Sequence, residues 1–388
     1  MITVSEALDR LFALAADMPT ETVPLTRAVG RVLAVPVTAT HAQPPFDASA
    51  MDGYGVASAK PGDRFIVIGE AAAGHGFAGS VGPGQAVRIF TGAPVPDGVA
   101  HVVIQEDITR DADIITVAET LGTGRNIRPA GGDFKPGSEI GAPRVLRPVD
   151  IALIAAMNVE TLTVFRQPDV ALIATGDELV TPGNRLGPDQ IVASNTYGLA
   201  AMLEQAGARP RILPIAKDTP GSMRHAFDLA SGADLIVTVG GASVGDHDLV
   251  APVADTLGFE RAFHKVAMRP GKPLLSGRMG GSMLLGLPGN PVSAMVCGHI
   301  FVRPVIRAML GLGRAPLPTQ KGALASPIGP NGPREHYMRA AITPEGLLVY
   351  GQQDSSLLSI LGAADALVVR PPGDPARDAG DSVAYLPL

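Results

Sequence analysis

Acidic, glycine-rich and cationic residues follow one another at the ends of predicted strands between residues 169 and 310. Thr175-Gly-Asp-Glu178 comes after one apolar run, and Lys217-Asp218 comes after the next. A third run precedes 240–248, which reads Gly-Gly-Ala-Ser-Val-Gly-Asp-His-Asp. Ligands bind outside the carboxyl ends of strands in open parallel sheets, so these residues are expected at one edge. Glycine turns there can hold a phosphate through backbone N–H groups.

Five carboxylates in these segments predict a divalent cation. They are Asp177, Glu178, Asp218, Asp246 and Asp248. Such a cluster would repel itself and a phosphate unless a hard cation such as Mg²⁺ lay between the side chains. The expected metal ligands are Asp177, Glu178, Asp246 and Asp248. Helix N-caps and turns are the alternative interpretation, and they suit Asp177 and Asp218 individually.

Two cations and a proline-rich turn follow the last two predicted strands. Arg269-Pro-Gly-Lys272 carries its charges on a stiff turn, which favours anion binding over solvated surface charge. Segment 287–293 reads Leu-Pro-Gly-Asn-Pro-Val-Ser, and it is a second glycine turn that leads into a helix. Cys297 lies in an apolar run and is expected in the core, not as a nucleophile.

Two polar segments lie outside this region. Segment 44–54 holds two carboxylates, hydroxyl groups and aromatic rings in a turn-rich loop, and segment 89–94 ends a strand with a hydroxyl at a tight turn. Structural and functional interpretations both stay open for them on spacing alone.

The elements that must position these residues alternate between strands and helices. Strands are expected at 170–174, 211–215, 235–239, 263–266 and 283–287, and helices at 196–205, 222–229, 249–256 and 292–310. This alternation predicts a parallel sheet that is covered on both faces. A capping box at Thr3-Val-Ser-Glu6 opens an amphipathic helix, and a second helix at 148–157 is expected to join it. Short strands and turns fill 60–141 and 311–388.

Length and charge exclude several classes of protein. The 388 residues are enough for two to three domains or more, and the net charge of −6 provides no positive field for nucleic acid. Segment 279–302 has no charged residue, but Pro288 and Pro291 exclude a membrane-spanning helix. The single cysteine cannot form an internal disulfide, and no export signal is visible, so we expect a cytoplasmic protein.

Six motifs occur in the order found in one known family, and the chain resembles the MoeA family of molybdopterin molybdenumtransferases, related to the E domain of gephyrin. The motif sequences are Ser-Ala-Met-Asp-Gly-Tyr (49–54), Phe-Thr-Gly-Ala-Pro (90–94), Thr-Gly-Asp-Glu-Leu (175–179), Gly-Gly-Ala-Ser-Val-Gly (240–245), Arg-Pro-Gly-Lys-Pro (269–273) and Leu-Pro-Gly-Asn-Pro-Val-Ser (287–293). The resemblance extends over essentially the whole chain.

The resemblance implies a multidomain α/β plus β architecture. A helical and extended dimerisation part would comprise 1–43 and 141–168, and an inserted β domain 44–140. A molybdopterin-binding α/β domain at 169–310 and a C-terminal β-barrel at 311–388 would follow. The family inserts molybdate into adenylylated molybdopterin and releases AMP and molybdenum cofactor, with Mg²⁺ or another divalent cation.

The resemblance also implies residue roles. The catalytic residues would be Asp52, Thr91, Glu178, Asp218 and Asp248, and Asp52 and Thr91 would reach the site from the partner subunit of a homodimer. Substrate would contact Thr175, Gly176, Asp177, Gly240, Gly241, Ser243, Gly245, Pro288, Gly289, Asn290 and Pro291. Molybdate would contact Arg269, Lys272, Ser293, one of Arg334 or Arg339, and Ser355. The carboxylates could act as metal ligands or as acid/base groups.

Some positions depart from the family pattern. Arg269 stands where lysine is usual, Ala48 where asparagine is common, and His336 where an acidic residue is usual. Asp354 and Ser356 flank the C-terminal serine in place of the usual residues. Adenylyl transfer onto molybdopterin and a binding or scaffold role are the alternative functions, and docking of a separate molybdopterin adenylyltransferase is an open question.

Overall fold

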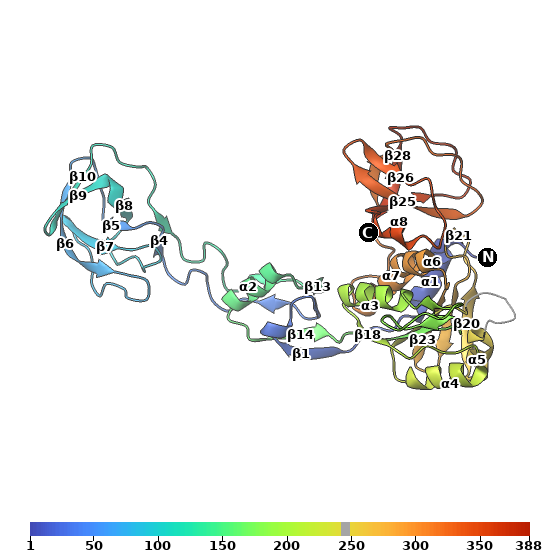
Figure 1. The fold of residues 1–388 in the computed structure, drawn as a ribbon. Helices are drawn as coiled ribbons and strands as arrows, with labels where there is room; N and C mark the ends of the chain where they lie inside the picture. The colour runs from blue at the N-terminus through green and yellow to red at the C-terminus, as the bar shows by residue number, and fades with distance from the viewer. Residues whose placement is uncertain (242–248) are drawn as a thin grey trace.

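The computed structural model describes residues 1–241 and 249–388. The molecule is elongated: a strand-rich part lies at one end, a smaller layer of strands with helix α2 (Pro148–Ala156) lies in the middle, and the α/β and C-terminal parts lie together at the other end (Figure 1). The fold is therefore multidomain and mixed, as predicted. The domain boundaries given above stay predictions.

A six-stranded sheet forms the α/β part, in the order β18-β15-β19-β23-β22-β20. The parallel strands are β15 (Asp169–Ala174), β18 (Arg209–Ile212), β19 (Leu235–Val239) and β23 (Ser282–Leu287). The antiparallel edge comprises β20 (Phe259–His264) and β22 (Leu275–Met279). Two expected strands are shifted: 211–215 begins earlier, and 263–266 is the end of β20. The chain turns back after His264, so β20 runs antiparallel to β22, which the sequence pattern missed.

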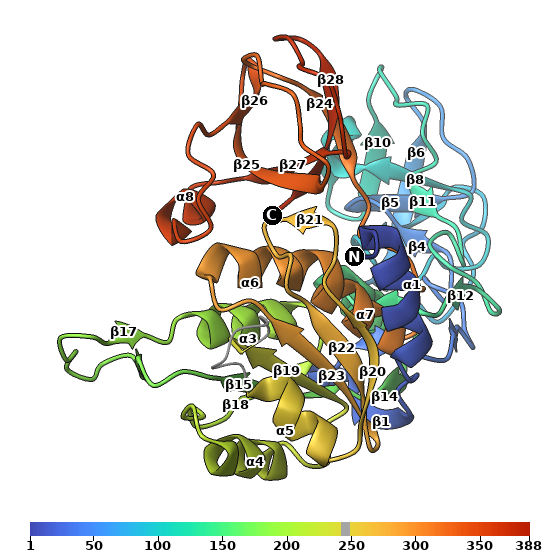
Figure 2. The same cartoon turned by 90° about the vertical axis from the view of Figure 1, so that its right-hand side faces the viewer.

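Alternate residues of the buried strands face two different helix layers. Val170 and Leu172 belong to one core with helices α1 (Val4–Leu14), α3 (Asn195–Gln205), α6 (Pro291–Cys297) and α7 (Arg303–Met309). Ala171 and Ile173 belong to the other core, with α4 (Pro220–Leu229) and α5 (Val250–Thr256). Both faces of the sheet are covered, as expected (Figure 2).

The opening helix packs elsewhere than expected. Its capping box is present, because Thr3 Oγ1 accepts from the Glu6 N–H and the Thr3 N–H donates to Glu6 Oε2. Leu8 and Leu11 pack in the α/β core, whereas Ile154 of α2 packs in a separate core. The expectation that the two helices join is therefore wrong, because each helix buries its apolar face against a different sheet.

The middle layer joins two segments through strands. Its sheet has the order β1-β14-β2-β13. The strands are β1 (Thr20–Pro24), β2 (Val32–Leu33), β13 (Arg144–Val145) and β14 (Thr161–Phe165), and a short 3-10 turn, η1 (Leu25–Arg27), follows β1.

The strand-rich end contains a sheet in the order β8-β5-β7-β6-β10-β9. Its strands are β5 (Gly53–Val56), β6 (Arg64–Ala71), β7 (Gln85–Ile89), β8 (His101–Ile104), β9 (Ile108–Asp111) and β10 (Ile114–Val117), and η2 (Gln105–Asp107) follows β8. Short pairs link it to the middle layer: β3 (Val37–Thr38) with β12 (Glu139–Ile140), and β4 (Ala48–Ser49) with β11 (Ile127–Arg128).

The C-terminal part is a sheet in the order β21-β25-β27-β28-β24, with β26 on β25. Its elements are β21 (Met268–Arg269), β24 (Gln320–Ala323), β25 (Glu335–Thr343), β26 (Gly346–Val349), β27 (Ala366–Arg370), β28 (Ser382–Pro387) and helix α8 (Leu358–Gly362). β21 comes from the α/β segment and pairs with β25, which ties the two parts together. A closed barrel stays a prediction.

One helical run among the described residues has the length and composition of a membrane span. It covers Pro291–Met309, and 72% of its apolar window is buried inside the protein. It comprises α6, the π-helical turn η3 (Gly298–Val302) and α7. Ala294, Phe301 and Val305 are fully buried in the α/β core, so this run is a core helix.

Candidate functional site

A pocket opens where the α/β sheet changes its direction of winding. The chain passes from β15 outward to β18, but from β19 it continues toward β23, so the switch point lies between the adjacent strands β15 and β19. A cavity of about 690 Å³ lies at the carboxyl ends of these strands, and we call it the sheet-edge pocket. The loops after β15, β19 and β23 and the start of α3 line it.

The sheet-edge pocket brings most of the predicted substrate residues together. Its lining includes Thr175, Gly176, Glu178, Asp218, Gly240, Gly241, Pro288, Gly289, Asn290 and Pro291. Asp177 is not among the lining residues. Ser243, Gly245, Asp246 and Asp248 lie outside the described residues. The roles assigned to all of these residues stay predictions.

The loop after β15 is fixed by its backbone. The Thr175 N–H donates to Val239 O at 3.0 Å, and the Gly176 N–H donates to Ala216 O at 3.1 Å. Gly176 has a φ of +145°, and a Cβ built there would lie 2.3 Å from Glu178 Oε2. The carboxylate of Glu178 therefore folds back over Gly176, and the positive φ at Gly176 favours glycine there.

The loops after β15 and β19 are in direct contact. The Gly240 N–H donates to Leu287 O at 3.1 Å, which holds it beside β23. Gly240 has a φ of +97°, and a Cβ there would lie 2.7 Å from Thr175 Oγ1. Glycine is needed at this position for both reasons. Both glycine turns line the sheet-edge pocket.

The carboxylates near the pocket differ in their surroundings. Asp177 Oδ1 accepts from the Asp218 N–H at 3.3 Å, and Asp177 O accepts from Lys217 Nζ at 3.3 Å, so Asp177 holds two loops together. Glu178 and Asp218 line the pocket, and no hydrogen bond from a described residue ends on either carboxylate. Two carboxylates are donors that suit a hard divalent cation. The described part of the chain contains no ready group of three His, Cys, Asp or Glu ligands.

The start of α3 contributes residues that the sequence analysis missed. Asn195 lines the sheet-edge pocket, and its Nδ2 donates to Gly289 O at 2.7 Å. The pocket is also lined by Ser194 and by strand β17 (Ile191–Val192). β17 pairs with β16 (Leu179–Val180), which follows the loop after β15. An asparagine at the start of a predicted helix beside two glycine loops was the available signal.

A bridge connects the pocket to the C-terminal part. Asn290 Nδ2 donates to Ser355 Oγ at 3.0 Å, and the Val292 N–H donates to Ser355 O at 3.1 Å. Ser356 itself lines the pocket. Ser293, by contrast, is buried within α6 and is not a lining residue.

The cationic residues gather around the pairing of β21 with β25. Arg269 lies opposite His336 in this pairing, and His336 lies opposite Arg370 of β27. Arg269 and Lys272 are exposed, Arg334 is half-buried, and Arg339 is buried. None of the four lines the sheet-edge pocket. They form a positively charged group at the junction with the C-terminal part.

Two of the departures from the family pattern differ in their charge beside this group. Burial, and then the charges of Arg269 and neighbouring arginines, lowers the pKa of His336 to about 4, so its ring is neutral at neutral pH. Asp354 Oδ1 accepts from the Ser356 hydroxyl at 2.6 Å and the Ser356 N–H at 2.8 Å. These bonds lower the pKa of Asp354 and turn its carboxylate toward its own loop.

Asp52 and Thr91 form a separate unit in the strand-rich part. The Thr91 N–H and hydroxyl both donate to Asp52 Oδ1 at 2.8 Å, and they lower the pKa of Asp52. Asp52 adjoins β5, and Thr91 follows β7, at the end of the molecule remote from β19 and β23 (Figure 1). A single chain therefore does not bring this pair to the sheet-edge pocket.

The fold and the pocket define a multidomain protein with a ligand-binding α/β part and accessory strand-rich parts. Three family models match: "MoeA N-terminal region (domain I and II)" at residues 2–158, "Probable molybdopterin binding domain" at 171–308, and "MoeA C-terminal region (domain IV)" at 321–388. The chain belongs to the MoeA family.

Curated relatives and a solved structure agree with this assignment. The molybdopterin molybdenumtransferase of Nostoc sp. is 36% identical over 393 residues, which covers 97% of this chain and 90% of the relative. That of Bacillus subtilis is 33% identical over 404 residues, covering 99% and 94%. The crystal structure of the molybdopterin biosynthesis protein MoeA from Pyrococcus horikoshii OT3 matches with a TM-score of 0.83 and 26% identity, over 100% of both chains.

Proposed function

We propose that this protein is a molybdopterin molybdenumtransferase, a transferase that inserts molybdate into adenylylated molybdopterin and releases AMP. One observation carries the proposal: most of the predicted substrate residues line one pocket at the switch point, in a chain similar over nearly its full length to curated molybdopterin molybdenumtransferases. The product would be molybdenum cofactor.

Different residues of the pocket would bind the pyrophosphate and the divalent cation. The close-packed turns at Gly176, Gly240 and Gly241 would form the surface on which the pyrophosphate that links the pterin to AMP lies, because glycines let a ligand approach the backbone closely. Glu178 and Asp218 would hold the divalent cation. When bound, that cation neutralises phosphate charge as the bond to AMP breaks.

The oxyanion substrate would bind beside this pocket. Molybdate is a dianion with four oxygen atoms, so it requires converging donors and positive charge. Exposed Arg269 at the end of β21 and exposed Lys272 just after it would provide that charge, and the Asn290–Ser355 bridge ties the C-terminal part to the pocket. Two Mo–S bonds to the dithiolene of the pterin would form as one Mo–O bond breaks, and the displaced oxygen would leave as water with the two thiol protons.

The remaining catalytic residues would come from a second copy of the chain. Asp52 and Thr91 lie far from the pocket within one chain, and the hydroxyl and N–H of Thr91 keep Asp52 ionised. We therefore propose a homodimer in which each sheet-edge pocket receives Asp52 and Thr91 from the partner. We also propose a cytoplasmic location, since buried Cys297 suits a reducing compartment.

AMP release from adenylylated molybdopterin tests the proposed activity. Release by the purified protein should require both molybdate and a divalent cation, and chelation should stop it. Release without molybdate, or product formation from ATP and molybdopterin, would instead support adenylyl transfer. Folded protein that releases no AMP under any condition would contradict the transferase activity.

A further inference from the structure

A second cavity lies between the α/β part and helix α8 of the C-terminal part, and we call it the α8 cleft. Its volume is about 270 Å³, and α3, α6, η3 and α8 contribute to its lining. α8 lies next to α6 in both views of the molecule (Figures 1 and 2). The side chains of Met295, Leu358 and Leu361 give the cleft an apolar wall. Ser194 and Asn195 line both this cleft and the sheet-edge pocket, so the two cavities share a wall.

His299 is the only ionisable side chain among the described residues that line the α8 cleft. It belongs to η3, and π-helical turns occur frequently at functional sites. Its Nδ1 lies 3.0 Å from Arg303 Nη1. Burial, and then the charge of Arg303, lowers the pKa of His299 to about 4, so the ring is neutral at neutral pH. A guanidinium can only donate, so Nδ1 accepts and the proton of the neutral ring is on Nε2. Nε2 forms no hydrogen bond with a described residue, and it is therefore a donor for a ligand.

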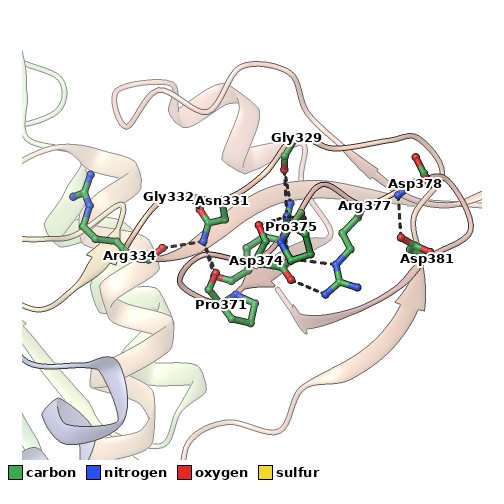
Figure 3. A network of polar contacts seen from close by, with 11 residues as sticks. Gly329, Asn331, Gly332, Arg334, Pro371, Asp374, Pro375, Arg377, Asp378 and Asp381 are labelled. Atoms are coloured by element: carbon green, nitrogen blue, oxygen red, sulfur yellow. Dashed lines mark hydrogen bonds and ion pairs between the residues drawn. The ribbon is translucent and has the colours of Figure 1, made fainter.

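Arg303 lacks the carboxylate partner that a comparable arginine has. Arg377, which is also half-buried, donates from Nη2 to Asp374 Oδ1 at 2.6 Å (Figure 3). Within the described residues, Arg303 donates only to the neutral ring of His299, and Arg307 follows one turn further along α7. No described carboxylate forms an ion pair with either Arg303 or Arg307. A partly buried cation is stabilised when an anion neutralises its charge, so this group favours an anionic ligand nearby.

The charges of a neighbouring cavity show which side of His299 an anion would choose. His299 also lines a cavity of about 320 Å³ between α1 and the C-terminal part. Asp9 and Glu335 line that cavity, and their carboxylates would repel an anion. Its Arg314 already donates to Asp17 Oδ1 at 2.9 Å. The α8 cleft, by contrast, has no acidic side chain among its described lining residues, so charge selects this cleft.

We propose that the α8 cleft binds a small amphipathic carboxylate. Its apolar body would lie against Met295, Leu358 and Leu361, and its carboxylate would accept a hydrogen bond from His299 Nε2. Arg303 would act through the ring, because its bond to Nδ1 fixes the tautomer and strengthens Nε2–H as a donor. A cavity of about 150 Å³ holds benzene, so this cleft has room for a body of roughly two rings or eight carbon atoms. The test of this site requires no turnover and does not depend on the proposed function.

Isothermal titration calorimetry with octanoate tests the proposal, and octan-1-ol is the matched neutral probe with the same chain length. The wild type should bind octanoate at least about tenfold more tightly than octan-1-ol, as expected for a charge-assisted hydrogen bond. His299→Phe keeps a ring of similar size but removes the donor. It should weaken octanoate binding about tenfold and change the Kd of octan-1-ol by less than about threefold. Equal octanoate affinities of the wild type and His299→Phe would overturn the proposal.

Leu358→Asp tests the apolar wall without changing the buried ring. Leu358 is 39% exposed, so we expect this variant to fold. Its new carboxylate should repel octanoate, whereas Leu358→Asn has nearly the same size and no charge. The aspartate variant should bind octanoate at least about tenfold more weakly than the asparagine variant. If both variants bind octanoate equally, the ligand does not lie in the α8 cleft and the proposal fails.

Three further variants locate the bound anion. Arg303→Met should weaken octanoate binding about threefold or more, because the donor on the ring loses its support. Arg224→Met is the matched control, since Arg224 is an exposed arginine of α4 on the opposite face of the sheet. Glu178→Gln changes only the sheet-edge pocket, and both controls should leave the Kd of octanoate unchanged. A loss in either control as large as that of Arg303→Met would overturn the assignment to the α8 cleft.

A second probe covers the shape of the apolar body. 2-Naphthoate has two rings and the same carboxylate, so it should bind to the wild type and lose about tenfold in His299→Phe. Wild-type protein that binds neither octanoate nor 2-naphthoate would overturn the proposal.

Discussion

The carboxylates of Asp52, Asp177 and Glu178 differ in the groups that they contact. Asp52 accepts two bonds from Thr91, Asp177 accepts one from the neighbouring loop, and Glu178 folds over Gly176 in the pocket. The bonds from Thr91 lower the pKa of Asp52. At the scale of single residues, Asp52 is therefore held ionised, while Glu178 is accessible to a cation.

Thr91→Val should shift the pH dependence of AMP release. The Thr91 N–H lowers the pKa of Asp52 most and its hydroxyl adds to this, so valine removes the second effect and keeps the first. The pKa of Asp52 then rises, and the acidic limb of the pH–rate profile should move to higher pH. Thr109→Val, at an exposed threonine of β9, is the control. An unmoved or lowered acidic limb would contradict a role for ionised Asp52.

His336 should make the protein less stable in mild acid. Its pKa is about 4 in the folded chain because of burial and nearby arginines, whereas an unfolded histidine titrates near 6.5. The unfolded chain therefore binds the extra proton first as the pH falls from about 6.5 to 4, and the free energy of unfolding decreases across that window. His336→Gln should make this decrease shallower in urea titrations.

Part of the acid sensitivity should remain in that variant. Burial also lowers the pKa of His299 to about 4, so this second histidine contributes with the same sign. His225→Gln removes an exposed histidine of α4 and is the matched control. If His336→Gln leaves the slope between pH 4 and 6.5 equal to that of wild type, the neutral, buried state of His336 is wrong.

At the scale of elements, the pocket depends on how closely the loops after β15 and β19 approach. Gly240 lies against Thr175, and a Cβ at Gly289 would lie 3.6 Å from the Gly240 Cα. β15 pairs in parallel with β19, and β19 with β23, so the three strands end side by side and their loops start at the same edge of the sheet. Gly240 after β19 and Gly289 after β23 thus lie in contact distance of each other and line the pocket.

Gly240→Ala should damage both the pocket and the stability. The positive φ alone costs about 1–2 kcal/mol, and the contact with Thr175 adds to it. AMP release should fall at least about tenfold through misplacement of the substrate. Gly232→Ala has a φ of +81° with open space around the new Cβ, so it measures the backbone cost alone and should retain activity.

At the scale of the whole molecule, the elongated shape separates groups that one reaction would use. Strands β5 and β7, next to the Asp52–Thr91 unit, lie at one end, and β23, whose following loop lines the sheet-edge pocket, lies at the other (Figure 1). A dimer with a twofold axis could bring each unit to the partner's pocket, and such symmetry repeats the same contact twice. The middle layer between the two ends keeps the strand-rich end away from its own α/β part, so it can reach the α/β part of a partner (Figure 1).

Mixing two inactive variants tests the shared site. Asp52→Ala and Glu178→Ala should each lose AMP release, but mixed dimers would contain one intact pocket, giving about a quarter of wild-type activity after random exchange. Asp218→Ala mixed with Glu178→Ala is the control, because both changes affect the same pocket and no intact site forms. Equal, negligible activity in both mixtures would contradict a site shared between subunits.

The local sequence was sufficient for features that depend on neighbouring residues. Apolar runs predicted β15, β19 and β23, the spacing of Thr3 and Glu6 predicted the start of α1, and two prolines excluded a membrane span. The polar segments after the strands predicted several of the residues that line the pocket, such as Thr175, Gly240 and Asn290. Strand and cap preferences act over a few residues, so one sequence carries them directly.

Only the tertiary structure decided features that depend on residues far apart in the chain. It turned Asp177 toward Asp218, packed α1 on the α/β sheet, reversed β20, and buried Arg339 while leaving Arg334 half-buried. Arg339 is buried in β25, where it donates to Gln353 Oε1 and Asp354 O, which follow it by 14 and 15 residues. Burial and register arise from long-range packing, which sequence spacing does not encode.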